Sequence, residues 1–312
     1  MKPVGMSRGR GISLVNDIST ISYGDNVVIQ KYIPNPLLLD GYKFDLRLYI
    51  LVTSFSPLEA FLYKEGFARL ASHEYNADLS DLHNKFMHLT NSSIQRHSEK
   101  AAPIFSEASP DDVGGTKTSL AYLWARLRER GINTDTLWAS ICDLVVKSLV
   151  CADDVVPYQP NSFEVFGYDV LIDSNLKPWL IEVNASPSMG VDSTLDNRIK
   201  QRLIADTIAL VDPLPFDRDR LAEVIADRKA QTAKAKQRPH VVPAAAGFGS
   251  GTGSTTSARE RRMLDAQLAS VLYGRVPRAY GDMPPNMGEY QRICPGSPSY
   301  DKVMRVKLAH LR

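Results

Sequence analysis

The most regular pattern in the chain is an alternation of apolar and charged side chains over residues 42–53. Apolar side chains occupy every second position, namely Phe44, Leu46, Leu48 and Ile50. The positions that alternate with Phe44 and Leu46 carry charge, namely Lys43, Asp45 and Arg47. Successive side chains of a β-strand point to opposite faces, so this pattern predicts a strand with one apolar and one charged face. Shorter β-rich runs over 27–33 and 59–63 predict two further strands.

A second pattern, over residues 163–184, predicts a β-hairpin. Both arms are rich in aromatic and β-branched residues, and the connection at 173–177 is made of turn formers. Pairing of the arms about this turn puts Asp169 almost opposite Glu182, and Asn184 shares a face with Glu182. Two acids this close repel each other unless a cation lies between them. Mg²⁺ takes such oxygen ligands when nucleotide phosphates also hold it, so the hairpin predicts a magnesium–nucleotide site.

Helical spacing of apolar residues occurs in three later segments. The first segment ends at Gly131, a favoured residue after a helix, and has its apolar positions at Leu120, Leu123, Trp124 and Leu127. The second is opened by Thr134 or Asp135 and has its apolar positions at Leu137, Ile141, Leu144, Val145 and Leu149. The third has them at Leu195, Ile199, Leu203, Ile204 and Ile208. These segments predict three helices that cover a sheet.

The composition changes after the third predicted helix. From about Asp227 the chain is charged and rich in alanine, and residues 247–256 are mainly Gly, Ser and Thr. Such a segment lacks the apolar side chains that a core needs. We therefore predict a catalytic region over 1–225, a flexible linker over 226–258, and a short helix with an irregular tail over 259–312.

The bulk composition narrows the class of protein. The chain has 312 residues, of which 44% are hydrophobic and 23% charged, with a formal net charge of +2. This near balance argues neither for nor against a nucleic-acid partner. The three cysteines are scattered and odd in number, which favours a reducing compartment over a disulfide framework. No apolar run is long enough for a bilayer and no signal peptide opens the chain, so we expect a soluble, cytoplasmic monomer that neither inserts in membranes nor binds nucleic acid.

Several other polar segments are candidates for binding chemistry, each with a plain alternative. The Gly- and Arg-rich opening of the chain suits phosphate, because glycine lets the backbone approach and basic groups neutralise charge; a disordered basic tail is the alternative. Residues 30–33 end a strand where adenine could bind, or are core residues. The charged face of 42–53 either is solvated or lines a phosphate- and ribose-binding cleft. Arg69 suits a carboxylate, or is merely exposed. Residues 88–91 either contact a nucleotide or form a capped loop.

In this order, the segments resemble the tubulin–tyrosine-ligase-like family of ATP-grasp ligases, and most strongly its glutamylases. The matching motifs are Lys2-Pro3, Arg8-Gly-Arg-Gly-Ile12, Gln30-Lys-Tyr-Ile33, Lys43-Phe-Asp-Leu-Arg47, Arg69, His88-Leu-Thr-Asn91, Phe166-Gly-Tyr-Asp169 and Leu180-Ile-Glu-Val-Asn-Ala-Ser-Pro187. The resemblance covers roughly residues 1–212. It implies an α+β fold, in which the central and C-terminal parts of an ATP-grasp form an antiparallel sheet flanked by helices.

The resemblance also implies a role for each matched residue. The residues expected to hold ATP are Lys2, Arg8, Gly9, Gln30, Lys31, Tyr32, Ile33, Lys43, Asp45, Thr90 and Asn91. Those expected to bind Mg²⁺ are Asp169, Glu182 and Asn184. Those expected near the free amino acid are Arg69, Ser92, Lys117 and Lys200. The residues expected to act in catalysis are Lys2, Arg69 and Glu182.

The reaction that the resemblance implies is ATP-driven isopeptide formation on tubulin. A glutamate side chain of the acceptor becomes an acyl phosphate, and the amine of free glutamate then displaces phosphate. The implied partners are free glutamate and the acidic tails of tubulin or microtubules. The implied location is the cytoskeleton, including the cilium, flagellum or basal body.

Two alternatives to a polyglutamylase stay open. Family members carry an N-terminal lobe and the first part of the central domain before the segment that matches Lys2-Pro3, where this chain begins. We therefore expect the chain to encode part of an ATP-grasp site. The alternatives are a glycylase and a non-catalytic, truncated paralogue that binds ATP or microtubules. The acids of the hairpin favour a catalytic origin, because a scaffold has no need of clustered carboxylates; the absent lobe favours the scaffold.

Overall fold

The computed structural model describes residues 1–6, 9–21, 24, 26–99, 116–157, 159, 162–236, 258–276 and 278–310. The chain forms two compact units, of which the larger comprises residues 1–211 and 283–312 and the smaller residues 212–282. Within the described ranges, no helix has the length and apolar character that crossing a bilayer requires.

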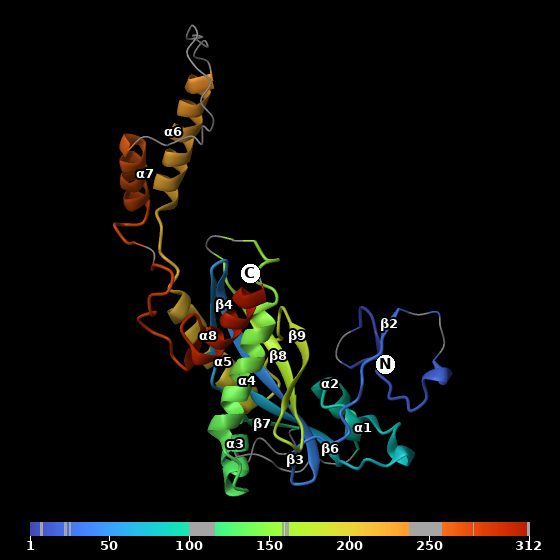
Figure 1. Ribbon diagram of the computed structural model, residues 1–312. Helices are drawn as coiled ribbons and strands as arrows, with labels where there is room; N and C mark the ends of the chain where they lie inside the picture. The colour runs from blue at the N-terminus through green and yellow to red at the C-terminus, as the bar shows by residue number, and fades with distance from the viewer. Residues whose placement is uncertain are drawn as a thin grey trace. The chain divides into compact units, whose positions relative to one another are not determined.

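The larger unit is built on one antiparallel sheet, which contains eight strands within the described residues (Figure 1). They are β3 (Leu38–Leu39), β4 (Tyr42–Phe55), β5 (Leu58–Tyr63), β6 (Phe67–Glu74), β7 (Lys117–Ser119), β8 (Glu164–Ile172), β9 (Pro178–Asn184) and β10 (Tyr290–Cys294). β4 is the central strand, because it pairs with β8 along one edge and with β6 and then β5 along the other. The expected antiparallel sheet with flanking helices is confirmed.

A separate two-stranded sheet joins β1 (Lys2–Pro3) to β2 (Val27–Val28). The strand predicted over 27–33 is therefore much shorter than its β-rich composition indicates. Residues 29–33 follow it without regular secondary structure, ahead of Pro34. Proline cannot donate to a strand ladder, which is consistent with the early end of pairing here.

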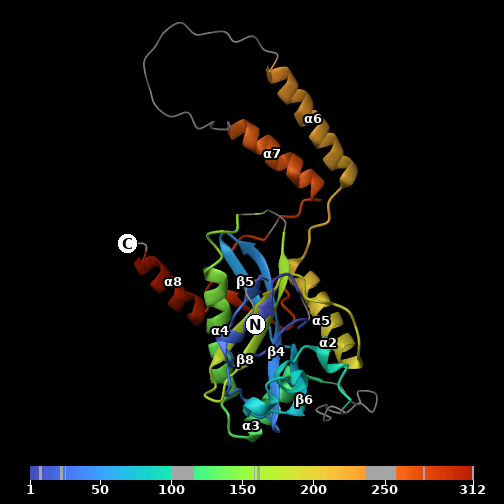
Figure 2. The same ribbon diagram turned by 90° about the vertical axis from the view of Figure 1, so that its right-hand side faces the viewer.

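The alternation in β4 gives the two faces of the sheet different surroundings. One face packs in a core with α3 (Leu120–Glu129) and α4 (Thr134–Val150), and its fully buried side chains include Phe44, Leu46, Leu48 and Ile50. The other face carries Tyr49 and Leu51 into a second core with α5 (Thr194–Val211). Figure 2 shows α4 and α5 on opposite sides of the sheet. The predicted apolar and charged faces of this strand are confirmed.

The three predicted helices are confirmed, with differences at their ends and faces. The backbone turns at Gly131, which has a φ of +75°, and Asn133 rather than Thr134 caps α4 through bonds to the amides that follow. On α5 the buried positions follow a different stripe from the predicted one. Ile204 and Ile208 are 43% and 55% exposed, whereas the buried side chains include Ile199, Leu203, Thr207 and Leu210.

Short helices connect β6 to β7 on the α5 side of the sheet. They are η2 (Leu79–Asp81), α1 (Lys85–His88) and α2 (Ser92–Gln95). A further 3₁₀ turn, η1 (Ile18–Thr20), lies in the N-terminal segment. These elements position the polar segment 83–97 beside the charged half of β4.

The C-terminal residues belong to the larger unit and differ from the irregular tail that the sequence predicts. β10 adds to the free edge of β5, with Tyr290 opposite Tyr63, and Ile293 is fully buried. The following helix, α8 (Pro298–His310), packs on α4, where Lys302 and Lys307 pair with carboxylates. The run that forms β10 is only five residues long and has no alternation of apolar and polar residues, so its pattern does not predict a strand.

The smaller unit consists mainly of α6 (Arg218–Lys236) and α7 (Ala258–Val271). Val224 of α6 and Val271 of α7 are buried, and Arg220 Nε donates to Ser270 Oγ at 3.3 Å. Figure 1 shows the two helices side by side. The predicted domain boundary at 225 therefore falls inside α6. The predicted linker begins within this helix, and its remainder, residues 237–257, lies outside the described residues.

We predict that β10 is part of the cooperative core of the larger unit. Ile293→Ala removes a fully buried side chain and should lower the free energy of unfolding by about 3 kcal/mol. Urea denaturation followed by tryptophan fluorescence measures this directly, because Trp124, Trp138 and Trp179 all lie in the larger unit. Val276→Ala, at an 83% exposed site of the smaller unit, is the control and should leave the transition unchanged. Equal urea midpoints for Ile293→Ala and Val276→Ala would show that β10 does not contribute to the stability of the larger unit.

Candidate active site

The charged face of β4 borders a cleft of about 1270 Å³ in the larger unit. Side chains from β4, β6, β7, β9, α5, the segment 83–97 and residues 9–11 line the cleft. Lys43 and Asp45 are only 7% and 6% exposed, and Arg47 is half-buried. A solvated sheet face would leave these side chains in water. The solvated alternative is therefore wrong for this strand face. Arg47 lines the cleft, and the binding of phosphate and ribose there stays a prediction.

Asp169 is held by two guanidinium groups, which belong to Arg47 and Arg69 of the cleft lining. Arg47 lies opposite it in the β4–β8 ladder and donates from Nε to Oδ1 at 2.6 Å and from Nη2 to Oδ2 at 3.3 Å. Arg69 donates from Nη2 to Oδ2 of Asp169 at 2.7 Å. Burial alone would raise the pKa of Asp169, but Arg69 and Arg47 outweigh it and hold the pKa below its usual value. Asp169 is thus an ionised carboxylate shared between two cations.

Arg69 also grips Asp45, its direct neighbour across the β4–β6 ladder. Its Nε donates to Asp45 Oδ1 at 2.8 Å and its Nη2 donates to Asp45 Oδ2, so the pair is bidentate. Burial opposes the charge of Arg69, but Asp45 and Asp169 more than compensate and raise its pKa. The expected bidentate arginine is present, and its partner is an acid of this chain. Its expected contact with a free amino acid stays a prediction.

The hairpin formed by β8 and β9 brings the three predicted metal ligands together. Asp169 is the ladder partner of Glu182, as the sequence predicts, and Ile181 forms an irregularity beside this pair. Asn184 Nδ2 donates to Gly167 O at 3.1 Å and to Glu182 Oε1 at 3.4 Å. Partial burial of the carboxylate and the nearby Asp169 raise the pKa of Glu182, while Asn184 and Lys2 act in the opposite direction.

The chemistry of this set suits a divalent cation. Within the described residues, no three His, Cys, Asp or Glu side chains are arranged to hold a metal ion. The hairpin set instead comprises two carboxylates and one amide, and Mg²⁺ that is also bound to phosphates takes only one or two carboxylates from a protein. Burial and the nearby Asp169 together raise the pKa of Glu182, and a cation between the two carboxylates would relieve their repulsion. The residues present therefore fit the predicted ion.

A second buried carboxylate, Asp196, organises the two lysines expected near the free amino acid. Lys117 Nζ donates to its Oδ2 at 2.8 Å, and Lys200 Nζ lies 3.1 Å from its Oδ1. Both ammonium groups also lie over the ring of Phe67, at 5.6 and 5.8 Å from its centroid. Burial would raise the pKa of Asp196, but Lys117 and Lys200 outweigh it and lower the pKa. Lys200 also donates to Gly190 O.

Sequence reasoning missed Asp196 although one signal for it was available. Asp196 and Lys200 are four residues apart on α5, the spacing at which helical side chains meet. The sequence could not show that Asp196 is fully buried, nor that Lys117, from a distant strand, shares it. Nothing in the sequence marked Phe67 as a site residue, because it stands in an apolar run that a buried strand also explains.

Lys43 lies in a separate buried cluster with Tyr32 and His88. Its Nζ donates to His88 O at 2.8 Å and to the Tyr32 hydroxyl at 3.0 Å, and this hydroxyl lies 3.0 Å from His88 Nδ1. Burial lowers the pKa of Lys43 to about 8, with Asp45 acting in the opposite direction. Burial also lowers the pKa of His88. Of the predicted adenine-binding run, Tyr32 and Ile33 are half-buried whereas Gln30 and Lys31 are exposed.

The N-terminal glycine segment packs closely against α2. Gly9 has a φ of +74°, and a Cβ built on it would lie 2.7 Å from Asn91 Oδ1 and 2.5 Å from Ile94 Cδ1. Glycine is required here both by conformation and by space. Arg8 falls outside the described residues. The structure brings eight of the predicted site residues to the cleft lining, namely Gly9, Arg69, Asn91, Ser92, Lys117, Glu182, Asn184 and Lys200. Thr90, beside Asn91, is buried.

Comparison with known proteins decides the family. The model of the tubulin-tyrosine ligase family matches residues 1–221. The chain belongs to this family. It is similar to human "Tubulin polyglutamylase TTLL5", with 42% identity over 220 residues that make up 68% of this chain and 17% of that protein.

Two further human relatives carry similar names. "Probable tubulin polyglutamylase TTLL2" is 40% identical over 67% of this chain and 34% of its own length, and "Tubulin polyglutamylase TTLL6" is 38% identical over 71% of this chain and 26% of its own length. The chain thus spans between 17% and 34% of the length of these relatives. The match to the tubulin-tyrosine ligase family runs from β1 through α5 and so includes every site residue described above.

We predict that Asp196 stabilises the wall of the cleft by compensating two lysines. Asp196→Asn leaves Lys117 and Lys200 without their carboxylate, of which Lys200 is buried, and should lower the free energy of unfolding by about 3 kcal/mol. Asp192→Asn, on the exposed residue just before α5, is the matched control and should have an effect below about 0.5 kcal/mol. Urea denaturation measures both. Similar stabilities for the two variants would contradict the assigned role of Asp196.

Proposed function

We propose that this chain is part of an ATP-dependent ligase that joins free glutamate to glutamate side chains of tubulin. The observation that carries the proposal is the cleft, which is lined by Glu182 and Asn184 of the predicted Mg²⁺ ligands and by two lysines that share one acid. Family membership and the names of the relatives support the same reaction class.

In the proposed reaction the protein supplies charge and position rather than a nucleophile. Asp169, Glu182 and Asn184 would hold Mg²⁺, which supplies electrostatic stabilisation to the transferring phosphate. Asp169 already pairs with Arg47 and Arg69, so it holds these two cleft-lining side chains in place before any ligand enters. Lys2 acts electrostatically on Glu182, which is consistent with a place for Lys2 near the phosphates.

The nucleotide would lie toward the cluster of Lys43, Tyr32 and His88. Lys43 is the buried cation of this cluster, and its Nζ lies over the ring of Tyr32, 4.5 Å from the centroid. Gly9 lies in the cleft lining next to Asn91 and would offer its backbone amide to phosphate oxygens. The remaining predicted ATP residues are Arg8, Gln30, Lys31, Ile33, Asp45 and Thr90.

Lys117 and Lys200 would receive a carboxylate of the free amino acid. With Asp196 between them, the three side chains have a formal charge of +1, which matches a single incoming carboxylate. The lysines are held by hydrogen bonds before binding, so little side-chain ordering is left for the binding step. Ser92 lines the same cleft and is the predicted polar neighbour.

Microtubules are the proposed cellular partner, and the cytoskeleton, with the cilium or basal body, is the proposed location. Both proposals follow from tubulin as the proposed acceptor.

Transfer of labelled glutamate tests the proposed reaction. The chain, and a version extended upstream, are incubated with ATP, Mg²⁺, tubulin and labelled glutamate or glycine. We expect glutamate incorporation that Glu182→Gln lowers at least about 100-fold, because a metal ligand is lost. Glycine incorporation without glutamate would identify a glycylase. Nucleotide binding without any transfer by either version would identify the non-catalytic paralogue.

We also predict that nucleotide binding takes up a proton at alkaline pH. With a pKa of about 8, Lys43 is mostly neutral in the free protein at about pH 9, and a nearby phosphate favours its charged form. Proton uptake should therefore increase as the pH rises from about 7 to about 9. Calorimetry of MgADP binding in buffers of different ionisation enthalpy measures it. Lys43→Arg stays charged and should abolish the uptake; equal uptake by both proteins would remove Lys43 from the nucleotide site.

A further inference from the structure

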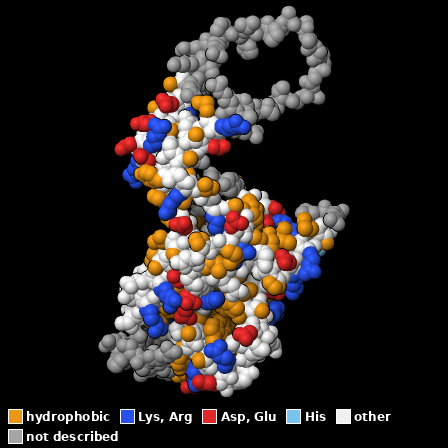
Figure 3. All heavy atoms as spheres, turned by 90° about the vertical axis from the view of Figure 1, so that its left-hand side faces the viewer, with side chains coloured by type: hydrophobic (Ala, Val, Ile, Leu, Met, Phe, Trp, Pro, Cys, Tyr) orange, Lys and Arg blue, Asp and Glu red, His pale blue; other side chains and the backbone are white. Residues whose placement is uncertain are grey.

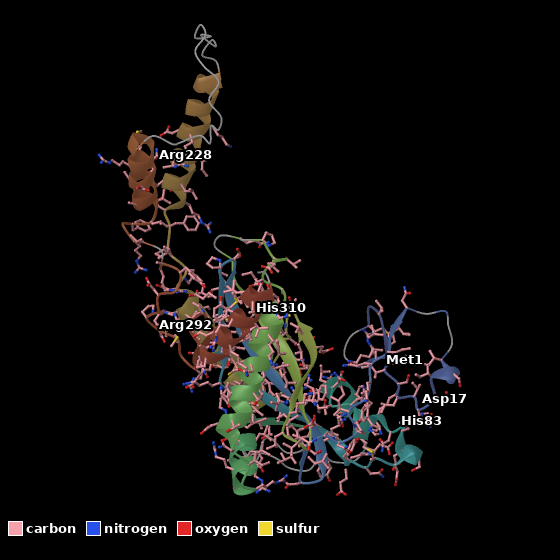
Figure 4. All side chains as sticks on the ribbon, viewed as in Figure 1. Met1, Asp17, His83, Arg228, Arg292 and His310 are labelled. Atoms are coloured by element: carbon pink, nitrogen blue, oxygen red, sulfur yellow. The ribbon has the colours of Figure 1, made fainter. Side chains whose placement is uncertain are left out.

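The helix α5 joins the cleft to a segment that the family match does not cover. Lys200, in its first half, lines the cleft. Asp206, in its second half, contacts residues 288–290, which belong to the larger unit but lie outside the match to the tubulin-tyrosine ligase family. In Figure 4, Arg292 of the adjoining β10 lies on the opposite side of the larger unit from His83, which lines the cleft. A contact at Asp206 can therefore reach the cleft through the helix.

The carboxylate of Asp206 accepts two hydrogen bonds at one oxygen. The hydroxyl of Tyr63 donates to Oδ2 at 2.9 Å, and the backbone amide of Glu289 donates to the same atom at 3.1 Å. Tyr63 is fully buried, and burial together with the bond to Asp206 raises its pKa. Gly288 has a φ of +51°, and a Cβ built on it would overlap the Asp206 carboxylate. The carboxylate thus fills the space beside this glycine and satisfies a buried hydroxyl.

The next residue of α5 makes a second buried contact with the same segment. Thr207 Oγ1 and the hydroxyl of Tyr290 lie 2.7 Å apart, and both residues are buried. The ring of Tyr290 meets the ring of Tyr63 edge to face, with centroids 4.8 Å apart. Arg202 also pairs with Glu289, at exposed positions where an ion pair contributes little. Acidic and basic side chains are intermingled on the face that Figure 3 draws as well. The buried hydrogen bonds therefore attach this half of α5.

Directional contacts are what define the position of this helix. The apolar side chains of α5 pack in the second core, and hydrophobic contact has no preferred direction. A hydrogen bond, in contrast, weakens steeply when its distance or angle changes. Asp206 follows Lys200 by six residues, which is about 9 Å along a helix axis. Because the helix between them is continuous, a fixed Asp206 also fixes the rotation and the axial position of Lys200.

We propose that Asp206 is a positioning residue for the amino-acid subsite, because its hydrogen bonds to Tyr63 and Glu289 set the position of α5 and with it the ammonium group of Lys200. The inference rests on the proposed function, which takes Lys117 and Lys200 as the groups that receive a carboxylate of the free amino acid. Small displacements of such groups are costly to binding and reaction. The segment that contains Glu289 then contributes to a site whose other residues all lie within the family match.

Labelling of lysines tests the position of Lys200 without requiring catalysis. The protein is treated briefly with an amine-reactive reagent, and mass spectrometry measures the labelling rate of each lysine. Lys200 and Lys43 should both react slowly in the unchanged protein, since they are 6% and 7% exposed. Asp206→Ala should raise the labelling rate of Lys200 by about fivefold, the effect of one lost hydrogen bond on local opening. Lys43 should keep its rate, because it lies on β4, whereas general loosening of the fold would raise both rates.

Three further variants make the labelling specific. Gly288→Ala displaces the same carboxylate without a change in α5, and should also raise the rate of Lys200 alone. Asp206→Asn keeps an oxygen that can accept both hydrogen bonds and should restore the slow rate. Gln201→Ala, at an exposed position of α5, is the control and should label as the unchanged protein does. Equal increases at Lys200 and Lys43, or no increase at Lys200 in Asp206→Ala and Gly288→Ala, would overturn the positioning role.

Glutamate transfer separates the positioning role from the proposed reaction. Asp206→Ala should raise the KM for glutamate about tenfold and change kcat and the KM for ATP far less, because the amino-acid subsite alone loses its alignment. If the unchanged protein transfers no glutamate, the proposed function fails, and a selective increase in Lys200 labelling still supports the positioning role. If the unchanged protein transfers glutamate and Asp206→Ala does so with the same KM, the positioning role fails and the proposed function stands.

Discussion

The structure depends on the compensation of one buried carboxylate, Asp169, by two arginines from neighbouring strands. Arg47 comes from β4, Arg69 from β6 and Asp169 from β8, so the ion network joins the three strands at the centre of the sheet. A buried charge without a partner costs several kcal/mol, which strongly disfavours any register that separates these groups. The same contacts that fix the strands therefore also fix Arg47 and Arg69 in the lining of the cleft.

The cleft repeats this principle at its side, where Asp196 joins β7 to α5 through Lys117 and Lys200. Each interior cation is thereby held in place before a ligand arrives, and the preformed arrangement is what electrostatic catalysis requires. The C-terminal residues support the same sheet from its far edge. Tyr63 of β5 donates to Asp206 of α5, and the backbone amide of Glu289, next to β10, donates to the same carboxylate. The segment after the smaller unit thus completes the sheet that carries the site.

The sequence predicted those parts of the fold and site that local pattern determines. The alternation in β4 and the pairing of Asp169 with Glu182 followed from period-two geometry, and the helices from their apolar spacing. The sequence pattern did not predict contacts between segments that are distant along the chain. The partners of Asp169, the position of Asp196 between two lysines, and the addition of β10 to β5 depend on tertiary packing. On α5, the burial of Thr207 instead of Ile204 reflects a hydrogen bond to Tyr290, which hydropathy alone does not reveal.

The central claim is that the oxygen atoms of Asp169, Glu182 and Asn184 bind a divalent cation together with nucleotide phosphate. The most direct measurement is the anomalous diffraction of Mn²⁺ in crystals of the protein grown with a non-hydrolysable ATP analogue. The account predicts an anomalous peak at about 2.0–2.3 Å from oxygen atoms of this set and of the phosphates. A bound nucleotide whose Mn²⁺ lies elsewhere, with Glu182 and Asn184 turned away from it, would contradict the account.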